Sequence, residues 1–295
     1  MSRLSFAGVI DVGNSGLKLA LADTRTGQLI AGTLRSCPWR SSSNQLKPPP
    51  PEWQAAQREA IAWDDPQSLA AAIRDMLRLH PASLAEPPVD WYLSCVQPQA
   101  VASLQQAVAA ATSHGRLTIL QQPDIELRCD VDFPQQVGID RLLAAWAAWE
   151  LSQHQGPLIV IQAGTAITVD WVNENGHFQG GAIMPGMAMM LKFLSQATAR
   201  LPWLAPTSDL EGVVLPGRNT EQAMMAGVVA CCLGGVAWLR QRYRQQYAGD
   251  HRRIQIYLSG GDGVALAHAM EGEYHLVDQL VLRGLAMFAG RARKG

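Results

Sequence analysis

Two short segments of the chain combine glycine with charged side chains, and the first also contains neutral hydrogen-bond donors. The first is Asp11-Val12-Gly13-Asn14-Ser15-Gly16-Leu17-Lys18. Its glycines let backbone N–H groups approach an anion, Asn14 and Ser15 are neutral donors, Lys18 is a cation, and Asp11 can hold a hydrated Mg2+. This combination suits phosphate binding, although the segment alone is equally compatible with an ordinary turn. Lysine is rare in the chain, occurring only at positions 18, 47, 192 and 294, which favours a role for Lys18.

The second segment is Gly138-Ile139-Asp140-Arg141, directly before a helical run from Leu142 to Leu151. Asp140 complements the helix dipole there, which is a common structural role for a carboxylate. Arg141 opposes the same dipole and therefore needs another partner, such as an anion or a carboxylate.

Three further segments have simple structural explanations when each is taken alone. Gly164-Thr165-Ala166 is compatible with a tight strand connection, and Thr220 with the cap of a following helix. Ser259-Gly260-Gly261-Asp262-Gly263 follows an apolar run and is compatible with a plain loop, or with a backbone surface against which a planar base lies.

Strands and helices alternate along the first half of the chain, which predicts the α/β class. We expect strands at Phe6 to Ile10, Leu17 to Leu21, from Leu29, at Val89 to Cys95 and at Arg116 to Leu120, with helices at Pro66 to Leu79 and Pro98 to Ala111. The segment from Asp11 to Lys18 thus joins two strands. Walker A loops and dinucleotide fingerprints join a strand to a helix, so both are excluded.

The same order of elements begins again near residue 158. Strands are expected at Leu158 to Ile161, Ile167 to Val172 and Phe178 to Met184, joined by a glycine turn and an Asn-Gly hairpin. Aligning the two halves sets Asp11 opposite Gln162 and Gly13 opposite Gly164. We interpret this as an internal duplication with domains at residues 1–124 and 125–295 and a binding cleft between them.

Composition restricts the partners. The 295 residues carry a formal net charge of -1, which gives no reason to expect nucleic acid or an anionic membrane. Five cysteines without metal-site spacing fit a reducing cytoplasm. The most apolar stretch, Ala223 to Leu239, contains glycines and is interpreted as a buried helix rather than a membrane span. The polar and proline-rich segment 41–51 is expected to form an exposed loop.

Eight motifs in order resemble the type III pantothenate kinases, which include the Bvg accessory factors and belong to the superfamily of acetate and sugar kinases, heat-shock 70 proteins and actin. They are DVGNSGLK at 11–18, SCVQP at 94–98, GIDR at 138–141, GTAITVD at 164–170, GGAIMPG at 180–186, TARLP at 198–202, GRNTEQAMMAG at 217–227 and LSGGD at 258–262. The resemblance implies two duplicated actin-like (ribonuclease H-like) ATPase domains.

The resemblance also implies ATP-dependent phosphorylation of pantothenate, the first step of coenzyme A synthesis. Residues 11–18 (Asp11, Val12, Gly13, Asn14, Ser15, Gly16, Leu17 and Lys18) would hold the ATP phosphates, Asp11 would hold Mg2+, and Thr165 would touch ATP. Asp140 would accept the hydroxyl proton. Gly138, Ile139, Asp140, Arg141 and Thr220 would bind pantothenate. The family is dimeric and uses a monovalent cation, K+ or NH4+.

Two positions depart from the family pattern. Gln162 replaces the aspartate that ligates the monovalent cation, and Val131 replaces a tyrosine of the pantothenate pocket. The sequence therefore leaves open whether the protein depends on a monovalent cation and how tightly it binds pantothenate. Two alternatives remain beside the enzyme: a non-catalytic regulatory homologue that acts by binding a partner, and a kinase of the same superfamily that acts on another sugar or small acid.

Overall fold

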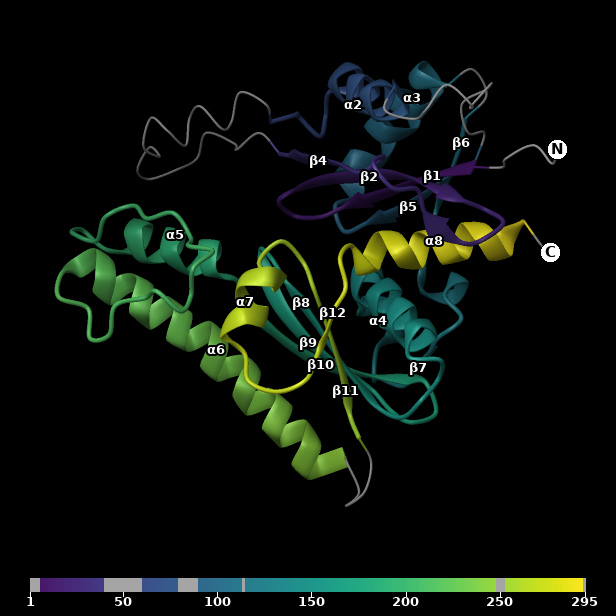
Figure 1. Ribbon diagram of the computed structural model, residues 1–295. Coiled ribbons are helices and arrows are strands. Elements are labelled where there is room, and N and C mark those ends of the chain that lie inside the picture. The colour runs from purple at the N-terminus through teal and green to yellow at the C-terminus, as the bar shows by residue number, and fades with distance from the viewer. Residues whose placement is uncertain (1–5, 40–59, 79–89, 113–114, 248–252, 294–295) are drawn as a thin grey trace.

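Two β-sheets lie on either side of a central pair of helices, and further helices cover their outer faces (Figure 1). The computed structural model describes residues 6–39, 60–78, 90–112, 115–247 and 253–293. The loop expected at 41–51 lies outside these ranges.

The first sheet is built from the N-terminal half of the chain. Its strands are β1 (Phe6–Val12), β2 (Gly16–Asp23), β3 (Gln28–Leu29), β4 (Arg35–Pro38), β5 (Asp90–Cys95) and β6 (Arg116–Ile119). The order is β3-β2-β1-β5-β6, with β4 also paired to β2. Apolar side chains on one face pack against α2 (Pro66–Arg78) and α3 (Val101–Ala111), which the short 3-10 helix Pro98–Ala100 precedes.

The second sheet repeats this plan. Its strands are β7 (Arg128–Cys129), β8 (Leu158–Ala163), β9 (Ala166–Val172), β10 (His177–Pro185), β11 (Gln255–Ser259) and β12 (His275–Leu276), in the order β12-β11-β8-β9-β10-β7. Its outer face is covered by α5 (Met187–Ala197), α6 (Thr220–Tyr247) and α7 (Gly263–Ala269). Short 3-10 helices at Gln122–Asp124 and Pro134–Gln136 lie in the connection between the halves.

The two sheets share one topology. In each, a central strand (β1 or β8) pairs antiparallel with the next strand along the chain and parallel with a later one (β5 or β11). The duplication expected from the sequence and the α/β class are therefore confirmed. The expected strands are present, most of them within two residues of their predicted ends, because the apolar runs and glycine turns that specify them are local signals.

Helices α4 (Ile139–Leu151) and α8 (Leu280–Ala292) fill the space between the sheets. They approach closely at Gly284, where an added Cβ would lie 2.6 Å from the carbonyl oxygen of Leu143. Although α8 ends the chain, it lies against β1, β2, β3 and β5 of the first sheet. The division into domains at 124/125 stays a prediction.

Helix α6 differs from its sequence-based interpretation. Among the described residues, it is the one helix long and apolar enough to cross a membrane by length and composition, but only 28% of its most apolar stretch is buried. The expectation of a buried core helix is therefore wrong. One side of α6 packs on the second sheet, and the other exposes small and apolar residues, among them Ala223, Gly227, Ala230 and Cys231.

Candidate active site

The turn between β1 and β2 is held from behind by two side chains. The indole of Trp39 donates to the carbonyl oxygen of Gly13 at 2.8 Å. The amide of Gln97 donates to the carbonyl oxygens of Gly13 and Asn14, each at 3.3 Å. In the described part of the chain, the backbone N–H groups of Asn14 and Ser15 donate to no acceptor. The turn thus presents free donors while its carbonyl groups are engaged, which is the arrangement an anion requires.

Asp11 lies beside this turn, near the end of β1, and is paired in the strand register with Lys18. Its Oδ1 accepts a hydrogen bond from the buried hydroxyl of Ser94 at 3.0 Å. The pKa of Asp11 is raised to about 6, mainly by burial and in part by the negative charge of Asp140, against the opposing effects of Lys18 and the Ser94 hydroxyl. Carboxylates from the two halves of the molecule are therefore close enough to interact electrostatically.

The turn between β8 and β9 meets the first turn directly. The hydroxyl groups of Ser15 and Thr165 form a hydrogen bond across the two halves. The N–H of Gly186 donates to the carbonyl oxygen of Thr165 at 2.9 Å, and an added Cβ at Gly164 would meet nothing within 4 Å. The two glycine turns that the sequence analysis aligned thus lie opposite each other, with open space beside Gly164.

The loop after β11 lies against the end of β8. Gly260 has φ +104°, and an added Cβ there would lie 2.0 Å from the carbonyl oxygen of Ala163. The N–H of Asp262 donates to the same oxygen at 3.1 Å. Only glycine allows this close approach of the loop to the second turn.

Asp140 and Arg141 belong to the first turn of α4, which begins three residues earlier than the apolar run at Leu142 indicated. The Oδ1 of Asp140 accepts the backbone N–H of Arg141 at 2.9 Å. An added Cβ at Gly138 would lie 2.5 Å from that oxygen, so a larger residue there would displace the Asp140 side chain from its present position. Burial raises the pKa of Asp140, an effect opposed by its interactions with Arg141.

The guanidinium of Arg141 has an internal partner that sequence reasoning did not assign. Its Nε lies 3.1 and 3.3 Å from the two carboxylate oxygens of Asp170 on β9, and its Nη2 also donates to Oδ1. The Asp170 side chain is 0% exposed, and burial raises its pKa to about 6 despite the nearby arginine. The signal was present in the sequence as a carboxylate inside the apolar strand Val169-Asp170-Trp171-Val172.

In the part of the chain that the structure describes, the side chains of the remaining candidates form no hydrogen bond with this group. Gln162 is half-buried near the end of β8, paired in register with Thr168 and Ser259. Val131 packs at the edge of the core, 3.5 Å from the position of an added Cβ at Gly180. Thr220 is exposed at the start of α6. Among the described residues, no group of three or more His, Cys, Asp and Glu side chains is arranged to hold a metal ion.

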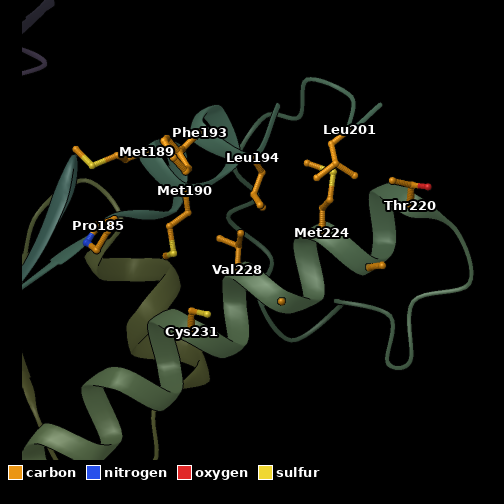
Figure 2. A pocket seen from close by; sticks show the side chains of 12 residues that line it. Pro185, Met189, Met190, Phe193, Leu194, Leu201, Thr220, Met224, Val228 and Cys231 are labelled. Carbon is orange, nitrogen blue, oxygen red and sulfur yellow. The ribbon is translucent and has the colours of Figure 1, made fainter. Parts of the chain in front are cut away.

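Thr220 borders an apolar groove of about 690 Å³ between α5 and α6. Figure 2 shows side chains of the two helices directed toward each other across it. Its lining residues are Pro185, Met189, Met190, Phe193, Leu194, Leu201, Thr220, Ala223, Met224, Gly227, Val228 and Cys231. Thr220 is the one hydroxyl in this lining, so the groove does not offer the charged groups that a nucleotide requires.

Comparison with known proteins gives a consistent set of matches. The family model described as type III pantothenate kinase matches residues 9–242. A type III pantothenate kinase of Rhodopirellula baltica is 39% identical over 169 residues, 56% of this chain and 58% of the relative. One of Rhodospirillum rubrum is 34% identical over 180 residues, 60% of this chain and 67% of the relative. The matched part thus spans about three fifths of these relatives.

A solved structure supports the fold over the whole chain. A protein from Campylobacter jejuni described as a Baf family transcriptional activator aligns with a TM-score of 0.53. The alignment covers 98% of this chain and 100% of that protein at 18% sequence identity. At this identity the similarity shows a common fold.

Proposed function

The chain belongs to the type III pantothenate kinase family, and from this membership we propose that it transfers the γ-phosphoryl group of ATP to the primary hydroxyl of pantothenate. The observation that carries the proposal is the meeting of the two glycine turns at Ser15 and Thr165, beside Asp11, whose carboxyl interacts electrostatically with Asp140. A phosphoryl donor held by the turns would lie beside a carboxylate able to accept a proton. The five free cysteines suit a cytoplasmic enzyme.

In this mechanism Asp140 is the general base. The hydroxyl oxygen of pantothenate attacks the γ-phosphorus, its proton passes to Asp140, and the bond between the γ-phosphorus and the β,γ-bridging oxygen breaks to release ADP. The raised pKa of Asp140 suits this role, because a base works best when its pKa approaches the working pH. One carboxylate oxygen is fixed by the N–H of Arg141, which leaves the other to face the substrate.

The phosphate groups would be held by the first turn. The free N–H groups of Asn14 and Ser15 and the ammonium of Lys18 supply donors and positive charge, while Thr165 approaches from the other half. Mg2+ fits beside them, since the pKa of Asp11 is raised in part by a second carboxylate, and Mg2+ commonly binds one or two carboxylates together with phosphate oxygens. When bound, Mg2+ neutralises charge that develops on the phosphate oxygens.

Arg141 would bind the carboxylate of pantothenate, together with the short segment Gly138, Ile139 and Asp140. In the described part of the chain, Nη1 of Arg141 has no hydrogen-bond partner, so it is available to an anion although Asp170 occupies Nε and Nη2. Val131 would contribute an apolar contact where the family has a tyrosine. A monovalent cation at Gln162 would be held weakly, because an amide oxygen offers only a dipole.

We also propose that the protein is a homodimer formed through α5 and α6, without nucleic acid or membrane as a partner. The support is the exposed apolar side of α6 together with the adjoining groove, where Phe193 is 68% exposed. Thr220 lies at this surface rather than beside Asp140, so a second copy could bring its own Thr220 to the pantothenate site.

The dimer is tested by light scattering after gel filtration. The wild-type chain should elute at twice the monomer mass, and Phe193→Asp should elute as a monomer. Leu151→Asp is the matched control, because Leu151 is an exposed apolar residue at the end of α4, away from the groove. A monomeric wild-type protein that floats with lipid vesicles would refute the dimer and point to membrane binding by α6.

The activity is tested by incubating the purified protein with ATP, Mg2+ and pantothenate and detecting phosphopantothenate by mass spectrometry. A product that increases with time and requires ATP would support the proposal. Nucleotide binding without product would contradict it and favour a regulatory homologue. Turnover of another small acid or sugar alone would show that the superfamily assignment holds with a different acceptor.

A further inference from the structure

Asp170 is a fully buried carboxylate for which the proposed phosphoryl transfer has so far no use. It lies in the middle of β9, between Val160 of β8 and Gly181 of β10 in the strand registers. An isolated charge in such a place is strongly unfavourable unless it is paired and hydrogen-bonded. Its partner is Arg141, whose side chain is 14% exposed and thus reaches from the core to the protein surface.

The contacts fix the guanidinium of Arg141 in both position and plane. The edge formed by Nε and Nη2 is engaged by the Asp170 carboxylate. One face of the guanidinium lies over the Phe178 ring, 5.5 Å from its centroid. Since a planar guanidinium with one edge engaged and one face covered has little freedom left, only Nη1 remains to meet an incoming anion.

The carboxylate of Asp170 is itself held tightly. Gly181 on the neighbouring strand provides the room, because an added Cβ there would lie 2.3 Å from Asp170 Oδ1. The pairing therefore cannot shift toward β10 without displacing backbone. The guanidinium of Arg141 is thus held in place by Asp170, a buried residue of β9 in the second sheet.

The same residue also orients the candidate base. The backbone N–H of Arg141 donates to Oδ1 of Asp140, whereas the side chain of Arg141 pairs with Asp170. We propose that Asp170 is a positioning residue, which fixes the Arg141 guanidinium so that Nη1 binds the carboxylate of the acceptor substrate. This inference rests on the proposed function, because it names how that site selects an acidic acceptor.

The test compares Asp170→Asn with the wild type in steady-state kinetics. The variant keeps the shape of the side chain but loses the charge that engages two guanidinium nitrogens. We expect the KM for pantothenate to rise about tenfold or more while the KM for ATP and kcat stay within about twofold. Equal changes in both KM values would indicate a merely structural carboxylate and overturn the proposal.

Asp90→Asn is the matched control. Asp90 also accepts hydrogen bonds from Nε and Nη2 of an arginine, Arg116, at 3.1 and 2.7 Å, but this pair is exposed on the first sheet. Its loss should leave both KM values unchanged. An equal rise in the pantothenate KM in this variant would show that the effect of Asp170→Asn is unspecific.

A second comparison tests whether Asp170 affects pantothenate binding only through Arg141. It does not require the single Asp170→Asn variant to fold. The double variant Arg141→Gln/Asp170→Asn has neither charge, and its pantothenate KM should match that of Arg141→Gln alone within about twofold. A further rise in the double variant would mean that Asp170 acts on the substrate by another route, which refutes the proposal.

A readout independent of activity separates this inference from the proposed function. The Nε–Hε resonance of Arg141, identified by its loss in Arg141→Gln, should exchange slowly with solvent in the wild type and rapidly in Asp170→Asn. If the wild type makes no phosphopantothenate but this difference is found, the proposed function fails while the fixed guanidinium stands. An unchanged resonance in Asp170→Asn refutes the positioning role whatever the activity.

Discussion

Replacing Asp11 by asparagine should make the protein more stable at neutral and alkaline pH, because the native fold holds this carboxylate in a place that disfavours its charge. The pKa of Asp11 rises from 3.8 to about 6 on folding. Below both values the group is protonated in the folded and the unfolded chain and has no effect. As the pH rises from about 4 to about 6, the unfolded chain loses the proton first, so the free energy of unfolding falls.

The size of the effect follows from the two pKa values. A shift of about 2 units corresponds to at most about 3 kcal/mol, and the linkage relation places about half of this, about 1.4 kcal/mol, between pH 5 and pH 8. The stability advantage of Asp11→Asn over the wild type should therefore grow by about 1.4 kcal/mol across this interval. Mg2+ would oppose the trend by binding the ionised carboxylate, so the experiment is done in EDTA.

The assay is urea unfolding of both proteins at pH 5 and pH 8, followed by tryptophan fluorescence. Lys18→Met is a control for which the direction of the change can be predicted. Lys18 lowers the pKa of Asp11, so its removal should enlarge the pH dependence in the wild-type background and have no such effect in Asp11→Asn. A stability difference between wild type and Asp11→Asn that is the same at both pH values, or smaller at pH 8, would refute the reasoning.

Three further substitutions test the proposed roles. Asp140→Asn should lower kcat about 100-fold or more while ATP binding, measured by calorimetry, is kept; turnover within a few-fold of wild type would place the base elsewhere. Arg141→Ala should raise the pantothenate KM far more than the ATP KM, and urea unfolding should show a loss of about 3 kcal/mol or more, since Asp170 is left unpaired. Gln162→Asp should create or strengthen activation by KCl at constant ionic strength, whereas saturable activation of the wild type at low millimolar K+ would contradict a weak site.

The strands and the two turns could be predicted because their signals are local. Gly13 and Gly16 lie between two apolar runs, and a glycine between two apolar runs returns at Gly164, so the hairpins and their duplication follow from neighbouring residues. The contact between Ser15 and Thr165 is consistent with that duplication, since a second glycine turn is expected to face the first across a cleft.

The partners of the charged groups could not be found in this way. Ser94 is 83 residues from Asp11, and Asp170 is 29 residues from Arg141, so each pair depends on how the sheets and α4 are packed. Both partners lie inside motifs that the sequence analysis singled out, yet no spacing rule assigns a carboxylate on a strand to an arginine on a helix. The exposed side of α6 was missed for a related reason. Apolar composition predicts burial but does not say whether the covering surface belongs to the same chain.

Equivalent positions in the two halves carry different side chains, Asp11 in the first and Gln162 in the second. This comparison offers a physical explanation for the neutral residue at position 162. Asp11 is the next-to-last residue of β1 and pairs with Lys18, whereas Gln162 is the next-to-last residue of β8 and pairs with Thr168. Position 162 is the counterpart of Asp11 in the second half, and a half-buried carboxylate there would, like Asp11, carry a charge that burial disfavours unless a cation offsets it. A neutral amide at that position removes the requirement. We therefore expect this chain to depend less on a monovalent ion than a variant with aspartate at position 162, which is the comparison that Gln162→Asp makes.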